Sequence, residues 1–208
     1  WTPNLLTRLN WKAIGSVLFP KLIGFDKKFS LISDKPLNDS LYSVFGDKTF
    51  ADAKIPLYLA ATDLLNGEQV IVHEGKITDG LRASISLPYL WPAWEVDGRL
   101  LIDGGPSGPM PVDVAIRENA DLILAMGFQD QEPQPMNSMV SYSFQIAGMM
   151  VNNLYQANFS FHNAVHHAEI VTIFPEFDRP IGVFDTHEFP YIIEQGEKAA
   201  EEIKAQKP

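Results

Sequence analysis

The sequence has 208 residues, 46% of them apolar and 20% charged, and this composition predicts one soluble globular domain with a substantial core. The formal net charge is −10 without any basic block, which argues against a surface for nucleic acid. The absence of cysteine excludes disulfides and thiolate chemistry.

The chain begins with Trp1, and the residues that follow do not form a signal peptide. No apolar run approaches the roughly 18 residues that span a bilayer. We therefore expect the chain to start inside a longer polypeptide. An acidic protein can still contact a membrane through an apolar patch, so the net charge excludes neither lipid substrates nor peripheral membrane contact.

The first part of the chain favours helices. Residues 4–25 have apolar residues at mixed helical spacing, interrupted by Pro20 and Gly24, and predict a pair of short packing helices. Residues 35–46 predict a helix that ends at Gly46 and has one apolar face, formed by Leu37, Leu41 and Phe45.

The middle of the chain favours strands. The apolar run Leu57–Ala61 predicts a strand buried on both faces, and residues 68–75 predict a second strand after a turn. A short helix ended by Pro88 follows. Residues 94–105 predict a hairpin whose two-residue turn is Asp97-Gly98.

The remaining elements alternate between helix and strand. They are a helix with Pro111 in its first turn, an apolar strand within 120–128, a long helix over about 139–167, a strand near 168–177 and a closing amphipathic helix over 189–206. The order strand, helix, apolar strand predicts an α/β fold with a mainly parallel central sheet.

Asp103 is the main candidate for chemistry. It ends the apolar stretch "RLLID" and is followed by Gly104 and Gly105. Catalytic groups of α/β sheets lie just past the carboxyl ends of strands, and glycines allow another group to come close. The alternative is an aspartate that begins a glycine turn and accepts a hydrogen bond from its own backbone.

The histidines could hold a metal. His162 and His166 are four residues apart on a probable helix, with His167 and Glu169 nearby. There is no H-E-x-x-H motif and no fixed third ligand, so we expect a solvated helix face and no metal. His73 and His187 have no motif around them.

No serine lies in an intact G-x-S-x-G, the strand-to-helix elbow of α/β acyl hydrolases. Ser16 lacks the flanking glycines. Ser107 in "GPSGP" comes closer, with Gly105 two residues before it, but Pro109 stands where the second glycine belongs. We therefore expect Ser107 to be a loop serine, and keep it as a minor candidate for a nucleophile.

An ordered succession of short stretches runs through the chain: "ATDL", "LRASISLP", "DGRLLIDGG", "PVDVA", "ADLILA" and, near the end, "GEKAAEEI". Through this succession the chain, from about Lys35 onward, resembles the second half of the patatin-like phospholipase family. It implies a patatin-like three-layer α/β fold, formed by residues 1–208 as a single domain that is incomplete at its N-terminus.

The resemblance also implies a serine hydrolase that uses a Ser–Asp dyad without histidine, metal or cofactor. The base lies in D-G-G, which here is Asp103-Gly104-Gly105. In the family, the G-x-S-x-G serine and the glycine-rich oxyanion loop both precede the residues seen here. The family often has asparagine shortly after D-G-G, where this chain has Gly108 and Pro109.

We therefore expect a lipid acyl hydrolase for which this chain supplies the base Asp103, with little activity of the chain alone. Trp91 and Trp94 are candidates to line an acyl site, with buried packing as the alternative. Two other functions stay open: a non-catalytic lipid- or partner-binding module, and a hydrolase that uses Ser107.

A chain that lacks the family's first strands should also lack sheet neighbours. We expect the strands Leu57–Ala61 and Leu122–Met126 to be short of partners, and such edges recruit other chains. The expected partners are a lipid or ester substrate and either the missing N-terminal segment or a second copy of the chain, and not nucleic acid.

Overall fold

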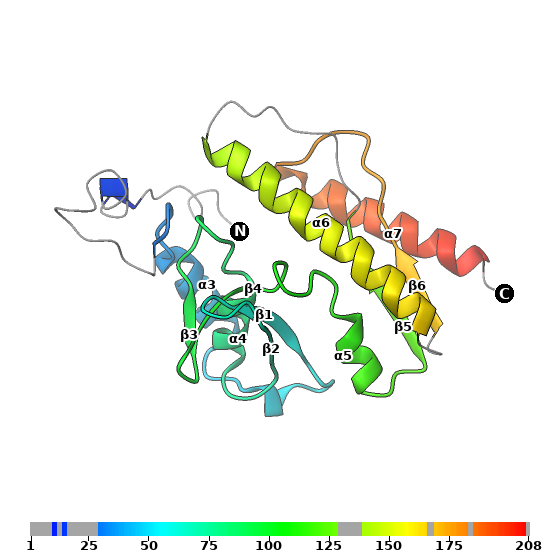
Figure 1. Ribbon diagram of the computed structural model, residues 1–208, viewed down its shortest axis with the longest axis horizontal. Helices are drawn as coiled ribbons and strands as arrows, with labels where there is room; N and C mark the ends of the chain where they lie inside the picture. The colour runs from blue at the N-terminus through cyan, green and yellow to red at the C-terminus, as the bar shows by residue number, and fades with distance from the viewer. Residues whose placement is uncertain are drawn as a thin grey trace. The chain divides into compact units, whose positions relative to one another are not determined.

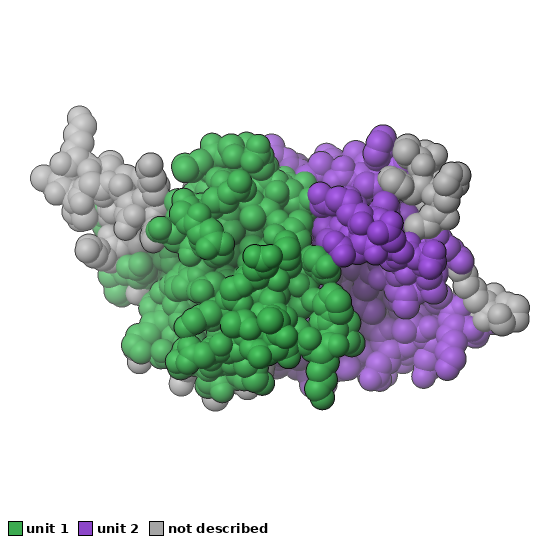
Figure 2. Space-filling view, turned by 90° about the horizontal axis from the view of Figure 1, so that it is seen from below, with its two compact units in different colours: residues 1–108 green, residues 109–208 purple. Residues whose placement is uncertain are grey.

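The computed structural model describes residues 10–11, 14–15, 29–128, 139–165, 169–182 and 185–206. It divides into two units, Trp1–Gly108 and Pro109–Pro208, which are shown in different colours in Figure 2. The two helices expected within 4–25 lie almost wholly outside the described residues.

In unit 1, helix α3 (Lys35–Phe45) confirms the helix expected over 35–46. Leu37 is buried, as the apolar spacing requires. The helix ends at Gly46, which has φ +56° and donates its N–H to the carbonyl oxygen of Tyr42. Glycine adopts this left-handed conformation without the strain that a Cβ introduces.

The sheet of unit 1 has four strands in the order β2-β1-β4-β3 (Figure 1). They are β1 (Leu59–Asp63), β2 (Gln69–Val72), β3 (Trp94–Val96) and β4 (Arg99–Asp103). Every neighbouring pair is antiparallel. The β3–β4 hairpin turns at Asp97-Gly98, with φ +49° and +77°, as the two-residue turn signal predicted.

Helix α4 (Ile77–Ser84) contacts three of these strands, and a 3-10 helix, η2 (Phe50–Asp52), precedes β1. The core of unit 1 consists of buried residues from the sheet, α4 and η2: Phe50, Ala61, Val72, Ile77, Ala83 and Leu101. This core fixes the positions of the strand ends on which the candidate site is built.

Unit 2 contains α5 (Val112–Arg117), β5 (Leu122–Met126), α6 (Met139–Val165), β6 (Glu169–Ile173), η3 (Thr186–Glu188) and α7 (Phe189–Gln206). Strands β5 and β6 pair in parallel, from Leu122↔Glu169 to Met126↔Ile173. The long helix α7 contacts β6, and the long helix α6 contacts α5 (Figure 1). A parallel pair needs a long crossover, and α6 lies within it.

The expectation of a mainly parallel sheet needs correction. The chain is mixed α/β, but the four-stranded sheet is antiparallel and the parallel pairing found among the described residues is β5–β6. The physical reason is that β1–β2 and β3–β4 are hairpins, whose short turns force the chain to reverse. An apolar run indicates a buried strand and says nothing of its direction.

The expectation of missing sheet neighbours is wrong for the first of the two strands. Strand β1 is central and pairs with both β2 and β4. Strand β5 has β6 as its single partner among the described strands, and its outward side chains Leu122, Leu124 and Met126 are 53%, 63% and 55% exposed. An unpaired, apolar strand edge is typical of a surface that binds another chain.

Candidate active site

The backbone of Asp103 is held from two sides at the end of β4. Its N–H donates a 3.0 Å hydrogen bond to the carbonyl oxygen of Ser86, which lies in the loop after α4. Its own carbonyl oxygen accepts a 2.8 Å hydrogen bond from the hydroxyl of Thr62 on β1. The peptide groups on both sides of this side chain are therefore fixed by neighbouring elements.

The carboxylate of Asp103 is half-buried, and its two oxygens differ. Oδ1 accepts a 2.7 Å hydrogen bond from the backbone N–H of Gly105, whereas Oδ2 has no hydrogen-bond partner among the described residues. Burial raises the pKa of Asp103, and the hydrogen bond from Gly105 opposes this rise only in part. The carboxylate thus begins a glycine turn with one oxygen and keeps the other available.

Gly104 has to be a glycine for steric reasons. A Cβ at this position would lie 2.7 Å from the backbone oxygen of Ala60 on β1, closer than real Cβ contacts allow. The carbonyl oxygen of Gly104 accepts hydrogen bonds from the N–H groups of Ser107 (3.2 Å) and Gly108 (2.8 Å). The chain therefore makes a sharp turn immediately after Asp103.

Within the described residues, the hydroxyl of Ser107 forms no hydrogen bond with the carboxylate of Asp103. Its hydroxyl lies 2.7 Å from that of Thr62 and 3.5 Å from the carbonyl oxygen of Gly104. Register explains this separation: Asp103 pairs with Ala61, so its side chain lies on the core face with Leu101, whereas Thr62 points to the opposite face. Without a base beside it, a serine hydroxyl is a weak nucleophile.

The structure reveals a further residue of this region, Arg82 in the stretch "LRASISLP", that the sequence did not single out. Its side chain is 1% exposed. The guanidinium donates hydrogen bonds to Asn38 Oδ1 (2.8 Å), Ser86 Oγ (2.8 Å), Asp34 Oδ2 (3.2 Å) and the carbonyl oxygen of Pro92 (3.3 Å). It joins α3, α4 and the loop whose Ser86 holds Asp103. The sequence held one signal for such a buried cation, a single arginine between small and apolar residues of a predicted helix.

The two tryptophans have different surroundings. The indole N–H of Trp94 donates to Asp79 Oδ1 (3.0 Å), and the guanidinium carbon of Arg82 lies 5.2 Å from the ring centroid. Trp94 also lines a cavity of about 430 Å³ together with residues of α3 and α4, so these contacts do not decide between an acyl site and structural packing. The buried indole nitrogen of Trp91 has no hydrogen-bond partner among the described residues.

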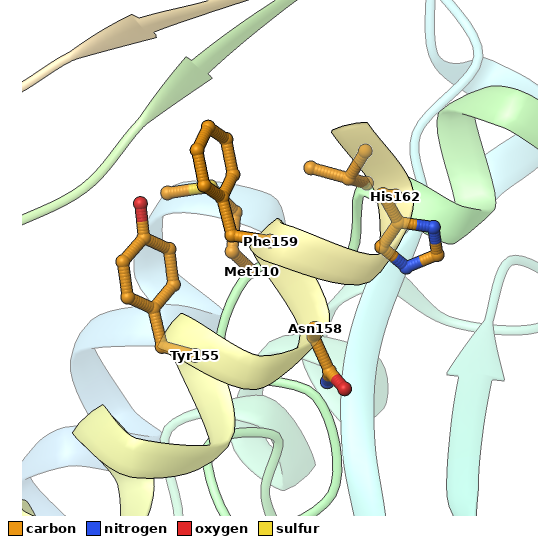
Figure 3. Close-up of a pocket in the computed structure, with 6 residues that line it drawn as sticks. Met110, Tyr155, Asn158, Phe159 and His162 are labelled. Carbon is orange, nitrogen blue, oxygen red and sulfur yellow. The ribbon is translucent and has the colours of Figure 1, made fainter. Parts of the chain in front are cut away.

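His162 lies on α6 in unit 2, far from Asp103 in sequence. It lines a cavity of about 10 Å³, enough for one water molecule, together with Met110, Val112, Tyr155, Asn158 and Phe159 (Figure 3). Burial raises the pKa of Tyr155. His166 and His167 lie outside the described residues, and the described ones contain no group of three metal-ligating side chains.

Comparison with known proteins gives the family. The model of the patatin-like phospholipases matches residues 4–116, more than half of the chain. The chain belongs to the patatin-like phospholipase family. The match includes Asp103-Gly104-Gly105 and runs past the boundary between the two units into α5.

The matched relatives are longer proteins. An uncharacterized NTE family protein of Mycobacterium tuberculosis is 37% identical over 97 residues, which are 47% of this chain and 27% of that protein. Human patatin-like phospholipase domain-containing protein 6 is 32% identical over 124 residues, 58% of this chain and 9% of the human protein. Mouse patatin-like phospholipase domain-containing protein 7 is 31% identical over 99 residues, 47% of this chain and 7% of the mouse protein. This chain spans a small part of each.

Within the described residues, no helix is both long enough and apolar enough to cross a bilayer, and this holds for the 27-residue α6 as well.

Proposed function

We propose that these residues belong to a lipid acyl hydrolase in which Asp103 is the general base of a Ser–Asp dyad. The serine and the glycine-rich oxyanion loop come from a segment outside these 208 residues. The absence of G-x-S-x-G from the sequence supports this origin, as does the greater length of the relatives. The substrates are carboxylic esters of phospholipids or simpler lipids.

The observation that carries the proposal is the oxygen Oδ2 of Asp103, which accepts no hydrogen bond from the part of the chain that the structure describes. It belongs to a half-buried carboxylate in the D-G-G of a patatin-like phospholipase, and the pKa of that carboxyl is raised by burial. A carboxylate with raised proton affinity is a better base for a hydroxyl. Gly105 holds Oδ1, which leaves Oδ2 as the oxygen that faces the serine.

The reaction then has two halves. Oδ2 takes the serine proton as the serine oxygen bonds to the ester carbon, and the carbonyl electron pair moves to its oxygen, which N–H donors stabilise. Collapse expels the alcohol, which takes the proton from Asp103. Water next gives a proton to Asp103 and adds to the acyl carbon, and the serine oxygen leaves with that proton.

We also propose that both units form one patatin-like domain, which is completed by strands of the missing segment beside β5. The continuous family match across the boundary at Gly108 supports the single domain. Strand β5 is apolar and has one paired neighbour among the strands that the structure describes, which supports a further neighbour, the missing segment or a second copy of the chain.

The test is Asp103→Asn in the intact enzyme, assayed with a short-chain nitrophenyl ester. We expect a loss of about 10²-fold to 10⁴-fold in kcat with the fold kept, since asparagine can still accept the hydrogen bond from Gly105. Asp97→Asn is the matched control, because asparagine suits the left-handed turn position at the other Asp-Gly of the same hairpin. Near-normal turnover by folded Asp103→Asn would refute the role.

A fluorophosphonate probe distinguishes the alternatives. Labelling of a serine outside these residues supports the dyad, and labelling of Ser107 shows that the nucleophile lies in this chain. An intact protein that neither hydrolyses esters nor reacts with the probe is a binding module.

A further inference from the structure

Two hydroxyl groups link β1 to the turn that follows β4. Thr62 Oγ1 lies 2.8 Å from the carbonyl oxygen of Asp103 and 2.7 Å from Ser107 Oγ. Thr62 is 3% exposed, so water does not compete freely for these bonds. The chain of contacts runs from the loop serine through the strand threonine to the backbone of the proposed base.

The number of protons fixes the direction of these bonds. A carbonyl oxygen can only accept, so Thr62 donates its single proton to Asp103. Thr62 then has lone pairs left, and the hydrogen bond between the two hydroxyls must use the proton of Ser107. Ser107 therefore donates to Thr62 at 2.7 Å, in preference to the carbonyl oxygen of Gly104 at 3.5 Å.

The bond to Thr62 complements the other contacts of Asp103. Ser86 binds the N–H of Asp103 and Gly105 binds Oδ1, so Thr62 supplies the third fixed point, at the carbonyl oxygen. That carbonyl belongs to the peptide that leads into Gly104, where the chain leaves the sheet. Its orientation sets the direction of the turn and hence the position of Gly105.

We propose that Thr62 and Ser107 are positioning residues for the base: their hydroxyls hold the backbone of Asp103 so that Oδ2 faces the attacking serine. This inference rests on the proposed function, and it gives Ser107 a role other than that of nucleophile. Loss of either hydroxyl loosens the backbone of Asp103, so that Oδ2 moves away from the serine and the carboxylate leaves its half-buried position and becomes better hydrated.

The experiment uses the intact enzyme with Thr62→Val, Thr62→Ser, Ser107→Ala and Asp103→Asn, and measures kcat and KM against pH. Thr62→Val keeps the shape and removes the hydroxyl, and we expect kcat to fall by about 100-fold with KM little changed, since a misplaced group costs that much. The acid limb of kcat should move to lower pH, because a better hydrated carboxyl has a lower pKa. Thr62→Ser should restore most of the rate.

Ser107→Ala keeps Thr62 and should give a smaller loss of kcat with a shift of the acid limb in the same direction. It remains informative if Thr62→Val does not fold. Thr172→Val is the matched control, because it removes a hydroxyl from a half-buried strand position on β6, opposite Ala125. We expect the wild-type pH profile for this variant.

The outcomes separate the two proposals. Activity of Asp103→Asn overturns the proposed function. If Asp103→Asn is inactive while Thr62→Val and Ser107→Ala keep the wild-type kcat and pH profile, the positioning role of the two hydroxyls is wrong. Asp103 then remains the proposed general base. A loss in Thr62→Val without a shift of the acid limb and without rescue by Thr62→Ser shows a general structural effect and also overturns the inference.

Discussion

Replacement of Arg82 by methionine tests how the loop beside Asp103 is supported. The guanidinium makes four hydrogen bonds within 3.3 Å, and its side chain is 1% exposed. Methionine fills part of the volume but leaves Asp34, whose side chain is 29% exposed, without its cation. Ser86 and Asn38 lose a donor at the same time.

We expect Arg82→Met to lower the free energy of unfolding strongly, because the carboxylate of Asp34 that remains is partly buried. Removal of one partner of a buried ion pair destabilises a protein by about 3–5 kcal/mol. For a chain of this size, 1 kcal/mol shifts the unfolding midpoint by about 2–4 °C, so we expect a fall of about 6–20 °C. Arg82→Lys should lie in between, because a single ammonium cannot reach Asn38, Ser86 and Asp34 together.

The assay is urea and thermal unfolding of the 208-residue chain, followed by circular dichroism and tryptophan fluorescence. Lys76→Met is the control. Its ion pair with Asp47 is shorter, 2.7 Å against 3.2 Å, but both side chains are at least half exposed. Water screens such a pair, so its loss should shift the midpoint much less. Equal shifts for Arg82→Met and Lys76→Met would show that burial of the network does not determine its contribution.

Three further predictions follow from the geometry. Gly104→Ala should destabilise the chain by about 1–3 kcal/mol, because its Cβ would lie 2.7 Å from a backbone oxygen of β1, whereas Gly196→Ala in α7 meets open space and should be neutral or stabilising in urea unfolding. Burial raises the pKa of Asp103, so the folded state binds the carboxyl proton more tightly than the unfolded state does. This proton binding adds to the free energy of unfolding below the unfolded pKa, about 3.9, and the addition is lost as pH rises through the folded pKa. Asparagine does not ionise, so Asp103→Asn should be at least as stable as wild type at pH 7 in thermal unfolding. A lower midpoint for this variant at pH 7 contradicts the argument from burial of the carboxylate. Leu124→Lys, on the exposed face of β5, should raise the monomer fraction in light scattering, whereas Leu65→Lys, 71% exposed in the β1–β2 turn, should not; equal association of both variants rules out β5 as the interface.

Local backbone rules made several features readable from the sequence. The Asp97-Gly98 turn and the end of α3 at Gly46 depend on left-handed φ values that few residues adopt, so the residue type identifies the conformation. Asp103 became a candidate for a similar reason, since an acid after an apolar strand and before two glycines is an unusual combination, and its role as the base stays a prediction. The family resemblance, confirmed by the match over 4–116, added the expectation that the D-G-G supplies the base.

Pairing of the strands could not be read in the same way. The runs that became β1 and β5 are both rich in apolar residues, yet Ala61, Thr62 and Asp63 are buried in succession, whereas β5 alternates between buried and exposed residues. An apolar run reports that a strand can be buried. Which strands flank it, and in which direction, depends on the connections between elements.

The contacts that orient Asp103 also needed the tertiary structure, because they join residues far apart in sequence. Thr62 is 41 residues from Asp103, and Arg82 is 48 residues from Asp34. A hydroxyl or a guanidinium has the same local pattern whether it faces water or a carbonyl group. Folding brings these groups together, since each hydrogen bond forms only when the sheet register and the packing of α3 against α4 place donor and acceptor within reach.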